Sequence, residues 1–171
     1  MKYESLIAAL AIAGATFAFS GGAQALEQKP VLDLTTAEIA ANACLAHQAT
    51  TGYAAINVVV VDDGGNTILL KRQDGACKAC GAIAEGKART AALYNMTTRT
   101  MEAASFGPAK DGVAADLPGA PFIPGIVAFP GGLPVQVDGA PIGGIGVSGA
   151  SADEDEACAT AALDAIKGVL N

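Results

Sequence analysis

The feature that most constrains the fold is an apolar, β-branched segment followed directly by a glycine-rich turn. Residues 54–61 (AAINVVVV) are typical of a buried strand. The next residues, 62–66 (DDGGN), are typical of a turn, and residues 67–71 are expected to return as a second strand. The segment predicts a β-hairpin and therefore antiparallel pairing of these two strands.

A second hairpin is predicted nearer the C-terminus. Residues 133–137 and 141–148 are expected strands, and the sequence Asp138-Gly139 between them favours a tight turn. A short apolar run at residues 126–129 (IVAF) is interpreted as a further strand before this hairpin. The last strand is rich in glycine, which indicates that another backbone or a ligand approaches it closely; these glycines are Gly143, Gly144 and Gly146.

Helical patterns fill the intervals between the strands. Thr35 and Glu38 have the spacing of a capping box, which predicts a helix over about 36–49. Ser151 and Glu154 repeat that spacing before a final helix that should run to about residue 170. A helix is expected over residues 82–95 and a short helix over residues 97–104. Residues 106–125 are expected to form a long irregular loop. Because the order lacks regular βαβ alternation, it predicts one α+β domain with helices on the faces of an antiparallel or mixed sheet.

Residues 1–25 have the pattern of a secretory signal peptide. An apolar run over residues 6–19 follows a short polar start, and Ala23-Gln24-Ala25 places small residues where a signal peptidase cleaves. The run is about 14 residues long, whereas a membrane span needs roughly 20. We therefore expect export to the periplasm or beyond the cell, no membrane insertion after cleavage, and a single domain over residues 26–171.

Composition and motifs exclude several functions. The net charge of −7 argues against binding nucleic acid or an anionic membrane, and with no tryptophan a base-stacking platform is not expected. The chain has one histidine and no phosphate-binding loop or HExxH motif, so no catalytic residues are assigned and a non-enzymatic role is favoured. The acidic run at residues 153–156 is interpreted as a helix start that matches the helix dipole, not as a metal site.

Four cysteines lie in the expected mature chain. An even number of cysteines in an exported protein favours disulfides, and three pairings of Cys44, Cys77, Cys80 and Cys158 are possible. The CxxC spacing of Cys77 and Cys80 also suggests a redox pair, since a helix start lowers the pKa of a thiol. Gly81 follows where covalent haem attachment needs a histidine, and a zinc site with His47 would need two segments to converge.

Several motifs occur in a fixed order along residues 33–170, and together they resemble a known family. They are Leu34-Thr35, VVDDGGN (60–66), DGA (74–76), KARTA (87–91), GGLP (131–134), IGVSG (145–149) and Asp155-Glu156. In this order they are similar to the GlcG/HbpS-like family of haem-binding proteins, which includes the C-terminal domain of PduO-type proteins. The four cysteines depart from that family's general pattern.

The resemblance implies a fold, an assembly and a ligand. The fold would be profilin-like, with a five-stranded antiparallel sheet, the first and last helices on one face and the middle helices on the other. The resemblance also implies a homo-oligomer and haem, or a related tetrapyrrole, as ligand. Because that fold makes the first and last helices neighbours, it favours the disulfides Cys44–Cys158 and Cys77–Cys80.

The candidate haem-binding residues lie mainly on the helix predicted over residues 82–95. Lys87, Thr90 and Tyr94 have the i, i+3, i+7 spacing of one helix face. Lys87 is a candidate partner for a haem propionate, and Thr90 and Tyr94 offer oxygen atoms to iron. The alternative is that Lys87 is solvated and the other two pack on the sheet. His47, the only histidine, is a further candidate iron ligand, although a surface or capping role is commoner for such a residue.

The favoured function is therefore an exported, non-enzymatic haem-binding protein for sequestration, delivery or sensing. One alternative is a periplasmic thiol–disulfide protein that uses Cys77 and Cys80. A second is an accessory subunit of a periplasmic oxidation system that acts through its surface, which the lack of a catalytic set suggests.

Overall fold

The protein folds into an α+β structure, described here by a computed structural model over residues 29–107 and 116–170. The predicted signal peptide lies outside these described residues, as does the middle of the loop predicted over residues 106–125. Within the described ranges, no helix combines the length and apolar character that crossing a bilayer requires.

The sheet has four antiparallel strands in the order β2-β1-β4-β3. The strands are β1 (Asn57–Asp62), β2 (Thr67–Arg72), β3 (Gly132–Val137) and β4 (Ala140–Ser148). Both predicted hairpins are confirmed. In the first, the Asp62 carboxylate accepts hydrogen bonds from the backbone N–H groups of Gly64 and Asn66. In the second, Asp138 and Gly139 both have positive φ, as a tight two-residue hairpin turn requires.

The prediction of five strands is wrong, because the described chain forms only four. Residues 126–129 were expected to be a strand, but they follow an irregular path without strand pairing. The Val127 N–H donates to the Thr90 hydroxyl at 3.0 Å, and Ala128 packs against Met101. The segment is therefore held by contacts with side chains instead of by pairing with a strand. An apolar run of four residues is too short to show the period that separates a strand from a packed loop.

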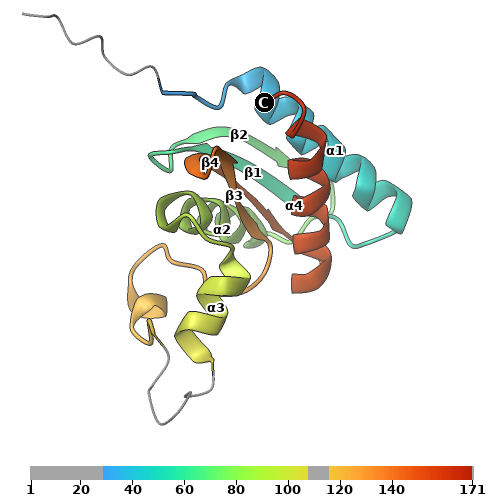
Figure 1. Cartoon of the computed structure of the whole chain (residues 1–171). Coiled ribbons are helices and arrows are strands. Elements are labelled where there is room, and N and C mark those ends of the chain that lie inside the picture. The colour runs from blue at the N-terminus through green and yellow to red at the C-terminus, as the bar shows by residue number, and fades with distance from the viewer. Residues whose placement is uncertain (1–28, 108–115, 171) are drawn as a thin grey trace, which may run out of the picture.

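Helices cover both faces of the sheet (Figure 1). The helices α1 (Leu34–Thr51) and α4 (Ala152–Ile166) pack side by side on one face, and α2 (Cys80–Tyr94) covers the other. A shorter helix, α3 (Thr98–Phe106), continues from α2, and a 3₁₀ turn, η1 (Ala120–Phe122), contacts α3. The expected placement of first and last helices on one face is therefore confirmed.

Two predicted helix ends differ from the observed ones. The helix α1 begins at Leu34, and its N-cap is Asp33, whose carboxylate accepts from the Thr36 N–H at 2.8 Å. The capping box predicted from Thr35 is therefore wrong, since Asp33 takes the capping position two residues earlier. The capping box at Ser151 is confirmed, but α4 ends at Ile166, four residues before the expected end.

The sheet alternates strictly between two cores. Val58 and Val60 point to the larger core beneath α1 and α4, whereas Val59 and Val61 point to α2. On the α2 side the packing is closest at β4: a Cβ on Gly146 would lie 2.0 Å from the Ala84 carbonyl oxygen. The predicted close approach of a backbone is confirmed at Gly144 and Gly146, which meet α2, whereas Gly143 meets Val61 of β1 and the Leu32 side chain.

The two edge strands of the described sheet are irregular. The pairing of β2 with β1 shifts register between Val60 and Val61, and the pairing of β3 with β4 shifts between Val135 and Gln136. In addition, β3 contains Pro134, which cannot donate a backbone hydrogen bond.

Candidate functional site

The candidate residues of α2 face three different environments, because the helix is pressed against the sheet on one side only. Lys87 is fully buried, Thr90 is 1% exposed and Tyr94 is 37% exposed. Small side chains at Ala84 and Ala88 let the helix approach β4, which buries any longer side chain on the same face.

Lys87 forms a buried ion pair with Asp155 of α4. Its Nζ lies 2.8 Å from Asp155 Oδ2 and 2.8 Å from the Val147 carbonyl oxygen, and it sits 4.7 Å from the centre of the Phe129 ring. The second oxygen of Asp155 accepts from the Ala150 N–H at 3.1 Å. Both predicted environments of Lys87, solvent or a haem propionate, therefore differ from the one observed.

Burial acts on the pKa of both members of this pair. Removal from water lowers the pKa of Lys87 and raises that of Asp155, while their mutual attraction opposes both changes. The pair joins α2 to α4 past the end of β4, so it links the two faces of the sheet. The sequence did not indicate Asp155 as the partner of Lys87, because the acidic run that contains it is already explained by a helix start.

Thr90 lines a small surface pocket beside α2. The pocket has a volume of about 240 Å³ and is lined by Arg89, Thr90, Leu93, Pro124, Gly125 and Ile126. Thr90 is almost fully buried, and its hydroxyl accepts the hydrogen bond from the Val127 N–H. The lining is mostly apolar, with one hydroxyl and one cation, which is a common composition for a ligand pocket.

The surroundings of this pocket are exposed and apolar. Leu93 is 56% exposed, and the adjoining loop presents Phe122 at 85% and Ile123 at 50% exposure. Arg89 has a half-exposed side chain, and its guanidinium lies 3.7 Å from the Glu85 carboxylate on the same helix. The pocket rim therefore combines apolar surface with a cation, and Arg89 is a candidate that the sequence reasoning did not single out.

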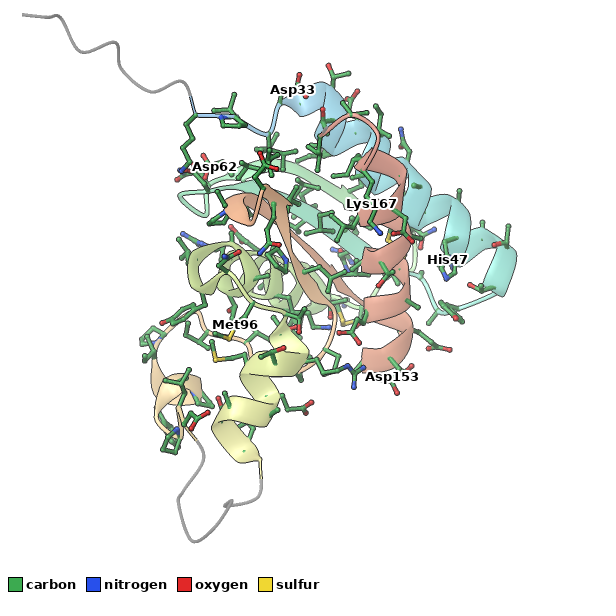
Figure 2. The ribbon with its side chains drawn as sticks, viewed as in Figure 1. Asp33, His47, Asp62, Met96, Asp153 and Lys167 are labelled. Atoms are coloured by element: carbon green, nitrogen blue, oxygen red, sulfur yellow. A yellow bond between two sulfur atoms is a disulfide. The ribbon has the colours of Figure 1, made fainter. Side chains whose placement is uncertain are left out.

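Tyr94 and His47 are not brought together. Tyr94 follows Thr90 by one helical turn at the end of α2. His47 lies on α1, across the sheet from α2, as Figure 2 shows. The His47 ring contacts Tyr53 edge-on, with 5.8 Å between ring centres, and its Nε2 is buried without a hydrogen-bond partner.

Both disulfides favoured by the resemblance are present. Cys44–Cys158 joins α1 to α4, and both cysteines are buried. Cys77–Cys80 closes the loop before α2, with Cys77 exposed and Cys80 as the first residue of the helix.

Loop closure gives the two disulfides different structural value. The Cys44–Cys158 bond, across 114 residues, lowers the entropy of the unfolded chain and so stabilises the fold by about 5 kcal/mol. The Cys77–Cys80 bond, across three residues, contributes about 2 kcal/mol in the same way. Cys44–Cys158 is therefore the main covalent support of the fold. Among the described residues, no group of three or more histidine, cysteine or acidic side chains is arranged to hold a metal ion.

Comparison with known proteins identifies relatives across most of the chain. A family profile described as "Haem degrading protein HbpS-like" matches residues 32–164. An uncharacterized 15.0 kDa protein of Citrobacter freundii is 38% identical over 106 residues, which cover 61% of this chain and 71% of that protein. Protein GlcG of Escherichia coli K12 is 36% identical over 93 residues, 54% of this chain; the match spans less than two thirds of GlcG, 63%.

Solved structures show the same architecture. A double mutant of HbpS from Streptomyces reticuli has a TM-score of 0.72 and 34% identity, covering 94% of this chain and 97% of that chain. ORFY of Klebsiella pneumoniae has a TM-score of 0.71 and 31% identity, covering 82% and 93%. PduOC in complex with haem has a TM-score of 0.70 and 25% identity, covering 81% and 96%.

Proposed function

Because this chain belongs to the HbpS-like family, we propose that it binds haem or a related tetrapyrrole in the pocket beside Thr90. The observation that carries the proposal is a pocket on α2 whose lining combines apolar side chains with the Thr90 hydroxyl and the Arg89 guanidinium. A similar structure, PduOC, was solved with haem, which supports the ligand class.

The chemistry of the pocket fits a tetrapyrrole that is only partly covered. Ligand pockets usually enclose roughly 300–1,000 Å³, so about 240 Å³ leaves much of a haem outside. The exposed side chains of Leu93, Phe122 and Ile123 offer apolar surface for the uncovered macrocycle. The Arg89 guanidinium matches the carboxylate of a propionate in charge and hydrogen-bonding geometry.

The residues proposed from the sequence take revised roles. Arg89 replaces Lys87 as the propionate partner, because the Lys87 ammonium is buried against Asp155. Thr90 and Tyr94 remain the proposed oxygen donors to iron, with Tyr94 one helical turn beyond Thr90 and outside the residues that line the pocket. His47, with its unpartnered Nε2, remains an alternative ligand for a separate site on α1.

The cellular role is proposed on the same basis. We propose an exported, periplasmic or secreted homo-oligomer that sequesters, delivers or senses haem without transforming it. A shallow, exposed pocket supports this role, since it would let haem pass to a partner. The role as accessory subunit of a periplasmic oxidation system stays a prediction.

A haemin titration followed by visible absorbance tests the proposal. We expect a saturable Soret shift, at about one haem per protomer or per dimer, and a spectrum that persists. Thr90→Val combined with Tyr94→Phe should abolish the shift, because it removes both oxygen donors. The control, Thr160→Val with Tyr53→Phe, makes the same chemical changes away from α2 and should leave the shift intact.

The possible contrary results are distinct. If the parent protein shows no Soret shift, the proposal that it binds haem is wrong. A shift unchanged in the α2 double variant but lost in His47→Ala would move the site to α1. Progressive bleaching of bound haem would replace the non-enzymatic role by haem degradation, the activity in the family's description.

A further inference from the structure

The Cys77–Cys80 disulfide joins one exposed cysteine to one nearly buried cysteine. Cys77 lies in the exposed loop before α2, whereas Cys80 is 8% exposed and begins the helix. An attacking thiolate can therefore reach Cys77 far more easily than Cys80. Attack on Cys77 makes Cys80 the leaving sulfur.

The start of α2 favours a negative charge on that leaving sulfur. The N-cap residue is Ala79, which makes no side-chain capping bond, and the Cys80 N–H donates to the Cys77 carbonyl at 3.3 Å. The positive end of the helix dipole lies at Cys80 and stabilises a thiolate there.

The charged residues around the disulfide in the sequence are mixed in sign. Lys78 lies between the two cysteines, and the Arg72 guanidinium donates to the Ala76 carbonyl at 3.0 Å, one residue before Cys77. Asp74 is the acidic residue of the same loop. Two cations against one carboxylate leave the loop favourable to a thiolate.

A buried acceptor without a donor lies beside the same helix start. Asn57 is 0% exposed, and its Oδ1 has no hydrogen-bond partner. A Cβ placed on Gly81, the second residue of α2, would lie 3.6 Å from that oxygen. The start of α2 therefore lies against a buried polar atom that the oxidised protein leaves without a donor.

We propose that Cys77 and Cys80 form a reversible thiol–disulfide exchange site whose co-reactant is a dithiol. A thiolate of the dithiol attacks the Cys77 sulfur, the Cys77–Cys80 bond breaks, and Cys80 leaves as a thiolate. The second thiolate of the co-reactant then attacks the co-reactant sulfur that is bonded to Cys77. The mixed disulfide breaks, and Cys77 leaves as a thiolate. Two electrons and two protons pass from the dithiol, which becomes a disulfide, to Cys77 and Cys80. This site is independent of haem binding.

Reduction of the native protein by dithiothreitol, followed by thiol alkylation and peptide mass spectrometry, tests the site. We expect Cys77 and Cys80 to become reduced while the protein stays folded, and to reoxidise when dithiothreitol is removed and oxidised glutathione is added. The internal control is Cys44–Cys158, which is buried and should stay oxidised until the protein unfolds.

Single variants test the order of attack. Cys80→Ser leaves the exposed Cys77 thiol and should accumulate a mixed disulfide with oxidised glutathione. Cys77→Ser leaves the nearly buried Cys80 and should accumulate much less. Equal trapping in the two variants would overturn the assignment of Cys77 as the attacked sulfur.

Ala79→Asp separates exchange from simple exposure of a disulfide. The new carboxylate caps α2 and adds negative charge beside Cys80, so reduction should slow by about two- to fivefold. Ala79→Asn is the neutral control and should have a smaller effect. If Ala79→Asp reduces as fast as the parent, or if Cys77–Cys80 resists reduction until Cys44–Cys158 also opens, the proposal fails.

Discussion

Replacing Lys87 by methionine should strongly destabilise the fold. Methionine has a similar length but no charge, so the change leaves the Asp155 carboxylate buried with one hydrogen bond, from the Ala150 N–H. It also leaves the Val147 carbonyl without its Lys87 partner. Breaking a buried ion pair by removing one member typically costs about 3–5 kcal/mol, against a whole-domain stability of about 5–15 kcal/mol.

The cost of Lys87→Met should depend on pH in a defined direction. Burial raises the pKa of Asp155, and loss of Lys87 removes the attraction that opposes this rise. A group with a raised folded-state pKa binds a proton in the folded protein before the unfolded chain does, so acidification favours the folded state. The destabilisation should therefore be smaller at pH 5 than at pH 8.

Urea unfolding of the oxidised protein, followed by far-ultraviolet circular dichroism, measures these differences. Lys78→Met is the matched control, because Lys78 is exposed and its replacement should change stability by less than about 0.5 kcal/mol. A second variant, Lys87→Met with Asp155→Asn, removes the uncompensated charge and should recover part of the loss. A cost below about 1 kcal/mol for Lys87→Met, or no recovery in the double variant, would refute this account of the ion pair.

Two further predictions concern packing and acid stability. Gly146→Ala should cost about 1–3 kcal/mol or more in urea unfolding, because the new Cβ meets the Ala84 carbonyl; Gly168→Ala, in open space, should be nearly neutral. Stability should also fall as the pH drops below about 4, which urea midpoints between pH 3 and 7 would reveal. Hydrogen bonds hold three carboxyl pKa values below their ordinary 3.8 or 4.5, so the folded state loses their contribution on protonation; the three are Asp33, Asp62 and Glu154. A midpoint that stays level to pH 3 would contradict this second prediction.

Local patterns predicted most of the fold. The hairpins follow from turn residues between apolar runs, and the glycines of β4 indicated the close approach of a backbone or a ligand, which α2 supplies at Gly144 and Gly146. The strand predicted at residues 126–129 was wrong for a non-local reason: Thr90, 37 residues away, satisfies the Val127 N–H. Local sequence carries no signal for such a contact.

The site was harder to predict than the fold. Spacing placed Lys87, Thr90 and Tyr94 on one helix face, but it could not show that Lys87 meets Asp155, 68 residues later. The pocket depends on residues 124–126, whose position relative to α2 no helical or strand pattern indicates. Arg89 is a candidate binding residue only because residues 124–126 form this pocket beside it. The disulfide pairing came from the family resemblance, since four cysteines alone permit three pairings.

The irregular edges of the sheet limit how copies of this protein can associate. An open edge strand is a template for continuing a sheet into a neighbouring molecule, and register shifts and proline interrupt such templates. Within the described chain, β3 contains Pro134, its pairing with β4 shifts register, and β2 holds the extra residue of its shift against β1. These edges therefore favour association of copies through helix faces and loops over end-to-end growth of one sheet.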